Sequence, residues 1–196
     1  MYRWSVPRSF GPVIVAAACG GACAAVPAPS AGASTLGQRI VADPVPGWKA
    51  APALASSFKQ QFTQGLTSEL SSSGINATVA AKAWQPSPGS SKEVGVLLVT
   101  FSASGVKQSV LSQIPLVAGK DTASQFCQGS SGKKPARMTT VAGVPHSHLA
   151  ICSPTADGTR TAAATFAKGT LLALVVATGF STSGLRTVAT TQYRAL

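Results

Sequence analysis

Acidic residues are scarce in this sequence, which has 5 Asp and Glu against 16 Lys and Arg in 196 residues. Carboxylate pairs for acid–base catalysis and carboxylate-rich metal sites are therefore poorly supplied. Charged residues of either sign make up only 11% of the chain, so the formal net charge of +11 is thinly spread. A nucleic-acid-binding domain has denser basic patterning, and we expect no nucleic acid as a partner. We expect a solvated, weakly cationic surface, with attraction to anionic envelope polymers or lipid headgroups as the alternative.

Recognisable catalytic motifs are also missing. No serine lies in a G-x-S-x-G motif, and no two cysteines form C-x-x-C. The stretch Gly129–Lys134 resembles a phosphate loop only superficially, because Cys127 and Lys134 occupy positions where the Walker spacing needs Gly and Ser or Thr. We therefore expect a protein that is not an enzyme and that carries no cofactor.

Histidine is rare as well, since His146 and His148 are the only two. On a strand, residues two apart share a face, and Cys152 would lie on that face too. A His-x-His pair can bind zinc or copper, with Cys127, Cys152 or a distant carboxylate as the third ligand. The simpler interpretation is two solvent-facing or partly buried histidines. His146 and His148 are thus the metal-site candidates, and no residue stands out as catalytic or cofactor-binding.

The apolar run near the start of the chain is too short for a comfortable membrane span. This run, Val13–Val26, has the length of a signal-peptide core, and Arg3 and Arg8 are the only charges before it. Ala31–Ala33 fits the small-x-small cleavage pattern. Residues 1–33 are therefore predicted to be an export signal, with Ser34 as the first residue of the mature protein.

Cys19 offers an alternative to cleavage at Ser34. The residues Ala16–Ala18 before it and Gly20-Gly21 after it look like a bacterial lipobox, although Ala16 stands where a large aliphatic residue is usual. A lipid on Cys19 would anchor the protein to the membrane, with Gly20–Ser34 as a flexible tether. Either alternative places the domain outside the cytoplasm, secreted or anchored.

Cys127 and Cys152 are the cysteines that remain outside the export segment. Two cysteines in an exported domain are most simply a disulfide. This bond would tie the middle helix to the sheet and contribute about 3–4 kcal/mol of stability.

The segment before the main domain is predicted to have little regular structure. From Val26 to Leu36 the chain consists mainly of Ala, Pro, Ser and Gly, without charge or period, which predicts a disordered linker. Pro44 and Pro46 favour extended backbone after it. We assign residues 34–50 to this linker and the lead-in to the fold, and residues 51–196 to a single domain.

Three helices are predicted. The clearest spans Ala51–Ser73, where apolar side chains recur every four residues. Val106–Gln128 is predicted as a helix in two pieces, broken at Pro115, with Asp121 capping the second piece. Thr182–Leu196 closes the chain as a helix whose apolar face is interrupted by Gln192.

Apolar runs between these helices predict the strands, which are Ile75–Trp84, Val94–Ser102, Met138–Ala142, Pro145–Ser153 and the two arms of Arg160–Phe180. The last hairpin should turn at Lys168-Gly169, which would set Phe166 opposite Leu171. Its second strand, Thr170–Thr178, is apolar on both faces and should lie centrally, covered above and below.

The order of these elements predicts an α+β fold. A mainly antiparallel sheet of about five to six strands would be covered by the N-terminal helix, the broken middle helix and the C-terminal helix.

The signal, the Ala/Pro/Ser-rich tether and the late pair Cys127 and Cys152 resemble exported proteins and lipoproteins of GC-rich Gram-positive bacteria. The segment Thr140–Pro145, followed by two hairpin strands, is similar to the second half of PsbP/Mog1-type lipoprotein domains. Those domains usually open with a strand pair before their first helix, where this chain has the short segment Leu36–Trp48. The resemblance identifies no functional residue.

Three functions are compatible with these features. The first is a non-catalytic extracytoplasmic domain that binds a partner protein or an envelope component. The second is a carrier that holds an apolar, lipid-like ligand between the sheet and the Leu54–Leu70 helix. The third is a hydrolase that uses His146 or His148.

Overall fold

The computed structural model describes residues 31–70 and 74–196. Most of the predicted export signal, including Cys19, lies outside these residues. In chain order the described elements are α2 (Ala31–Gln38), β1 (Lys49–Ala50), α3 (Pro52–Leu70), β2 (Asn76–Gln85), β3 (Glu93–Ser102), α4 (Gln108–Leu111), α5 (Gln113–Ser131), β4 (Arg137–Thr139), β5 (His148–Ile151), β6 (Thr161–Lys168), β7 (Leu171–Thr178) and α6 (Thr182–Ala195).

The strands form one antiparallel seven-stranded sheet in the order β1-β2-β3-β7-β6-β5-β4. The predicted α+β class is confirmed, but the sheet has more strands than expected. The additional strand is β1, whose two residues lie in the predicted lead-in to the fold. A strand this short has too few residues to show an alternating pattern, so the sequence carries no signal for it.

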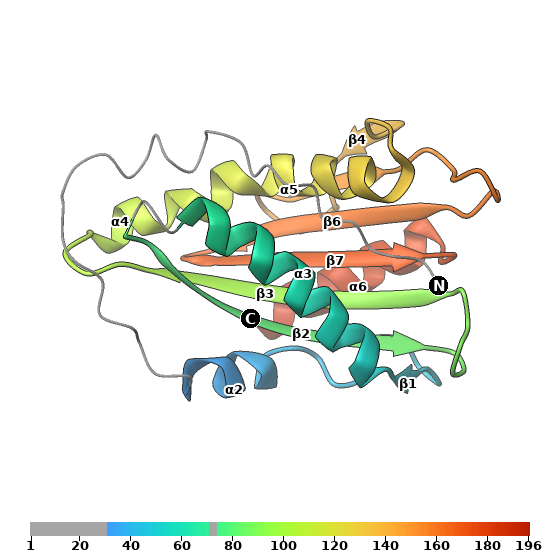
Figure 1. The fold of residues 1–196 in the computed structure, drawn as a ribbon, viewed down its shortest axis with the longest axis horizontal. Coiled ribbons are helices and arrows are strands. Elements are labelled where there is room, and N and C mark those ends of the chain that lie inside the picture. The colour runs from blue at the N-terminus through green and yellow to red at the C-terminus, as the bar shows by residue number, and fades with distance from the viewer. Residues whose placement is uncertain (1–30, 71–73) are drawn as a thin grey trace.

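Strand β7 lies at the centre of the sheet, as its composition predicts. All of its residues are buried, because helices cover both faces. Helices α3 and α5 cross one face, and α6 lies on the other (Figure 1). Helix α2 packs beside β2 on the α6 side, through Leu36 and Ala80.

Helix α3 is held by its apolar stripe. Phe58, Phe62, Leu66 and Leu70 are buried against the sheet, and Leu54 at the start of the stripe is half-buried. Gly95 of β3 lies beneath this helix: a Cβ there would touch the Phe58 ring at 3.5 Å and would crowd the Val176 side chain of β7 at 3.0 Å. The interior between α3 and the centre of the sheet is therefore tightly packed at this point.

Gln192, the polar residue on the apolar face of α6, has a structural role. Its side chain is fully buried. The amide nitrogen donates to the carbonyl of Arg39 at 2.8 Å, and the amide oxygen accepts from the backbone N–H of Val41 at 3.0 Å. These bonds satisfy the buried amide and fix the chain that leaves α2.

The last hairpin turns one residue later than predicted. Lys168 pairs with Leu171, so the loop is Gly169-Thr170, and Phe166 lies opposite Ala173 rather than Leu171. Gly169 has φ +61°, which glycine adopts at low cost, and this places it at the first loop position. Every partner shifts by two residues, so the assignment of side chains to faces is unchanged.

The middle helix breaks at Ser112, between α4 and α5, and not at Pro115. Pro115 lies in the first turn of α5, where its missing N–H removes no intrahelical bond. Asp121 lies inside α5, so the prediction that it caps a helix is wrong.

The prediction of a disordered linker is wrong for the last residues of that segment. Ala31–Leu36 belong to helix α2, and Leu36 is buried. The helix lies against β2, since a Cβ on Gly37 would be in van der Waals contact with that of Ala80, at 4.0 Å. The apolar Leu36 and Ile40, which both enter the core, therefore order a segment whose composition resembles a tether.

Candidate functional site: a groove beside an open strand edge

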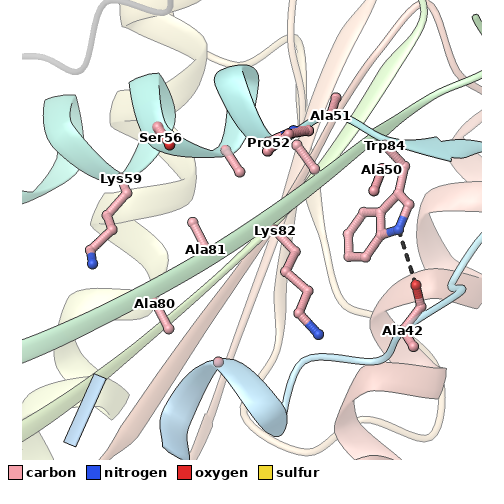
Figure 2. A pocket seen from close by; sticks show the side chains of 13 residues that line it. Ala42, Ala50, Ala51, Pro52, Ser56, Lys59, Ala80, Ala81, Lys82 and Trp84 are labelled. Atoms are coloured by element: carbon pink, nitrogen blue, oxygen red, sulfur yellow. Dashed lines mark hydrogen bonds between the residues drawn. The ribbon is translucent and has the colours of Figure 1, made fainter. Parts of the chain in front are cut away.

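A groove with a volume of about 580 Å³ runs beside β2. Helix α3 forms one wall, and α2 with the chain that follows it forms the other (Figure 2). The lining residues are Gly37, Ala42, Ala50, Ala51, Pro52, Ala55, Ser56, Lys59, Ala80, Ala81, Lys82, Ala83 and Trp84.

Small side chains create this space. Strand β2 reads NATVAAKAWQ, and its alanines project only a methyl group toward the helices on either side. Ala51 just before α3, and Ala55 and Ser56 in its first turns, are also short. The cleft between α2 and α3 therefore stays open where larger apolar residues would have filled it.

One edge of β2 enters this groove, where Ala80, Ala81, Lys82, Ala83 and Trp84 line it. Strand β1 pairs with Trp84 and Gln85, and the N–H of Ala51 donates to the carbonyl of Ala83 at 2.8 Å. Within residues 31–70 and 74–196, no strand pairs with this edge of β2 before Ala83.

The Ala51–Ala83 bond shows which backbone groups of β2 lie on this edge. Alternate residues of a strand turn their N–H and C=O groups to the same side. Since Ala83 faces outward, Ala81, Val79 and Ala77 also present their N–H and C=O groups at the open edge. Such an edge is a template for an additional strand.

The α2 wall of the groove is fixed by hydrogen bonds to β2. Lys82 donates from Nζ to the carbonyl of Ile40 at 2.9 Å. Trp84 donates from Nε1 to the carbonyl of Ala42 at 3.1 Å, as Figure 2 shows. Together with the Gln192 bonds, these contacts hold residues 39–42 in place.

The groove is positively charged. Lys59 on the α3 side and Lys82 on the α2 side both line it, and none of its lining residues is acidic. Lys59 is exposed, so its ammonium group is free to move toward a bound carboxylate. The groove therefore suits a ligand with negative charge on both of its sides.

The two histidines are not brought onto one strand face. Strand β5 begins at His148, and His146 lies before it in a turn with φ +52°, so the predicted strand Pro145–Ser153 is too long at both ends. Burial, and then the positive charge of Lys120, lower the pKa of His148, with Asp121 acting in the opposite direction. Among the described residues, no three His, Cys, Asp or Glu side chains are grouped to hold a metal ion.

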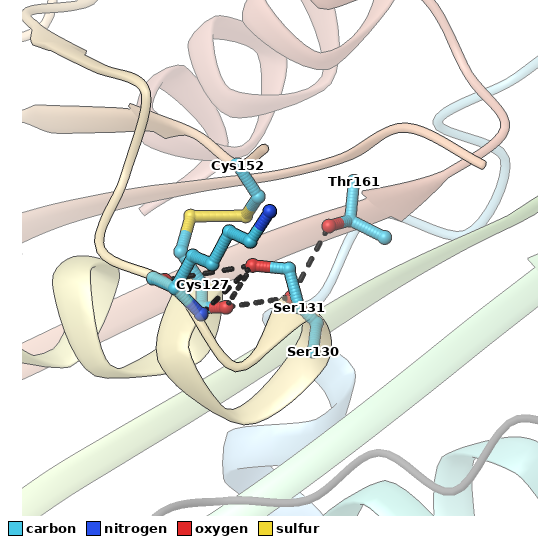
Figure 3. Close-up of a disulfide and its surroundings, with 6 residues drawn as sticks. Cys127, Ser130, Ser131, Cys152 and Thr161 are labelled. Carbon is cyan, nitrogen blue, oxygen red and sulfur yellow. Dashed lines mark hydrogen bonds between the residues drawn. A yellow bond between two sulfur atoms is a disulfide. The ribbon is translucent and has the colours of Figure 1, made fainter. Parts of the chain in front are cut away.

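Cys127 and Cys152 form the predicted disulfide, which joins the end of α5 to the segment after β5 (Figure 3). Ser130 and Thr161 share a hydrogen bond of 3.2 Å beside it, and Ser131 donates to the carbonyl of Cys127 at 2.8 Å. The disulfide is consistent with a location outside the cytoplasm. None of the helices that the structure describes is long and apolar enough to cross a membrane.

No protein-family model matches this chain, and a search of curated proteins finds no match.

Sequence reasoning missed the groove. Its lining residues fall in the predicted lead-in to the fold, in a predicted strand and at the start of a predicted helix, and none of these patterns indicates a groove. The available signal was the run of alanines in β2, whose side chains are too small to fill the space between neighbouring helices.

Proposed function

We propose that this protein is a non-catalytic extracytoplasmic domain that binds a partner protein by accepting an extended segment in the groove. The observation that carries the proposal is the edge of β2 that enters the groove at Ala81, where no strand of the described residues pairs with the outward backbone groups of Ala77, Val79 and Ala81. Addition of a strand to a sheet edge is a common mode of peptide recognition, in which main-chain hydrogen bonds provide much of the affinity.

The dimensions suit a short segment. The stretch from Ala77 to Ala81 is about 14 Å long at about 3.4 Å per residue, so about five residues of a partner pair with it. Each backbone hydrogen bond contributes about 0.5–1.5 kcal/mol net. The fixed α2 wall lowers the entropic cost of binding, because residues 39–42 are already ordered.

The two lysines give the partner its chemistry. Side chains of an added strand alternate between the α3 side, where Lys59 lies, and the α2 side, where Lys82 lies. An acidic residue on each face of the added strand would therefore lie beside one of the two lysines. The preferred segment carries two carboxylates separated by an odd number of positions, with small or medium apolar residues toward the alanines.

Export of the protein is part of the same proposal. The apolar run Val13–Val26 and the cleavage pattern at Ala31–Ala33 support a signal peptide, and a lipid on Cys19 is the alternative route to the envelope. The disulfide supports the same location, since such bonds persist in oxidising compartments.

The test is selection of displayed random peptides on the exported protein, followed by affinity measurements on two variants. Ala81→Pro removes one outward N–H, while the bonds between β2 and β3 remain. We expect the selected peptides to bind the Ala81→Pro variant about tenfold more weakly than the wild type, because one hydrogen bond is lost and the proline ring clashes with the added strand. Lys59→Glu should weaken acidic peptides, whereas the matched control Lys120→Glu on α5 should not.

Two results would contradict the proposal. One is a selection that yields no peptide. The other is a set of peptides that bind the wild type, Ala81→Pro and Lys59→Glu equally well, which would place the binding surface elsewhere.

A further inference from the structure

Basic residues gather at a second surface, the end of the sheet where β2 and β7 finish and β3 and β6 begin (the right-hand end in Figure 1). All of them are exposed, and they are Lys49, Lys92, Lys133, Lys134, Arg137 and Arg160. We call this surface the basic end.

The strand register shows that these residues lie along one row. Lys49 pairs with Gln85 at the end of β2. Glu93, the next residue after Lys92, pairs with Thr178. Thr178 in turn pairs with Thr161, the next residue after Arg160.

The row continues to the far edge of the sheet. The N–H of Cys152 donates to the carbonyl of Thr161, and the N–H of Ala136, next to Arg137, donates to that of Ile151. Cations therefore occur at β1, β3, β6 and β4, each two strands from the last. At about 4.8 Å between strands, they are spaced by about 10 Å over a length of about 29 Å.

Loop contacts bring the remaining groups to this row. Gly179 donates to the carbonyl of Arg160 at 2.9 Å, and a Cβ on it would lie 3.1 Å from the side chain of Lys92. The Ser130–Thr161 hydrogen bond places the end of α5 at the same level. Lys133 and Lys134 follow within a few residues, on the loop that leads to β4.

Carboxylates at this end only partly offset the cations. Glu93 is buried. The Asp157 carboxylate accepts hydrogen bonds from the hydroxyl of Thr155 and from the hydroxyl and backbone N–H of Thr159. Asp43, next to Ala42, is the other acid near the row. The surface therefore keeps a net positive charge.

We infer that the basic end binds a linear polyanion with repeating phosphate charges, of the class of phosphate-linked envelope polymers. Exposed ion pairs are worth little one at a time, so a single phosphate gains little at any of these cations. A chain of phosphates that follows the row makes several such contacts at once, and each contact after the first is intramolecular. This surface lies outside the groove, and the inference goes beyond the proposed function.

The test measures binding of long-chain inorganic polyphosphate to the exported protein at several salt concentrations. The variant Lys92→Gln/Lys134→Gln/Arg160→Gln removes three cations from the basic end. The control Lys107→Gln/Lys120→Gln/Arg194→Gln removes the same number and types of charge from exposed positions elsewhere. We expect the first variant to bind about tenfold more weakly at low salt. The plot of log affinity against log salt should become less steep by about 2, because each of the three lost contacts contributes about 0.7 to the steepness.

Three results would overturn the inference. Equal weakening by both triple variants would show attraction to net charge alone. If orthophosphate at the same total phosphate concentration displaces bound polyphosphate as well as free polyphosphate does, no extended site exists. Binding to vesicles rich in phosphatidylglycerol, without binding to polyphosphate, would identify the basic end as a membrane-facing surface.

Discussion

Replacement of Gln192 by Leu should destabilise the protein far more than its position near the C-terminus suggests. The change keeps the side-chain volume and removes two hydrogen bonds, to Arg39 and Val41. Each bond contributes about 0.5–1.5 kcal/mol, and a partly buried backbone group left without a partner costs about 1–3 kcal/mol. Since these backbone groups are only partly buried, we expect a loss of about 2–3 kcal/mol in the free energy of unfolding.

Urea unfolding measures this loss, and hydrogen exchange locates it. The Val41 amide is protected by the Gln192 side chain, so it should exchange at least about tenfold faster in the variant. Thr191→Leu, at an exposed position of the same helix, is the matched control and should change stability by less than about 0.5 kcal/mol. Unchanged exchange at Val41, or equal effects of the two substitutions, would refute the assigned role of Gln192.

Other predictions concern the disulfide, His148 and Gly95. Replacement of both Cys127 and Cys152 by Ser opens a loop with a sequence separation of 25 and should cost about 3.5 kcal/mol in denaturant unfolding; an unchanged midpoint would contradict this. The lowered pKa of His148 means that the unfolded chain binds its proton more readily, so stability should fall as pH drops below 6.5. His148→Asn should flatten the dependence of stability on pH, and a variant whose stability varies with pH as the wild type's does would contradict this role of His148. Gly95→Ala introduces a Cβ 3.0 Å from Val176 and should cost about 1–3 kcal/mol in thermal unfolding, whereas a neutral effect would show that the site can relax.

The centre of the fold was predictable because its signals are local and strong. A continuous apolar run such as Leu171–Thr178 needs cover on both faces, so it predicts a central strand wherever its partners lie. The stripe from Phe58 to Leu70 predicts a packed helix for the same reason. Exact strand pairing was harder, because Gly169 can occupy more than one position of a short turn and only the folded hairpin selects one.

Features that depend on distant parts of the chain could not be predicted. Gln192 appears in the sequence as a flaw in an apolar face, since its partners at Arg39 and Val41 lie over 150 residues away. The basic end could not be predicted either, because Lys92 and Arg160 are isolated in sequence and lie in one row, two strands apart, only through the strand register. The alanine run of β2 hints at the groove, but the open edge beside it depends on where β1 ends along β2, which no local pattern describes.

Amide hydrogen exchange at Ala77, Val79 and Ala81, with and without a selected acidic peptide, tests the central claim most directly. If the edge of β2 is open, these three amides exchange rapidly in the free protein, while Ala80 and Lys82, which face β3, are protected. The peptide should then protect the three outward amides and leave the others unchanged. Protection in the free protein, or no gain on binding, would contradict strand addition at this edge.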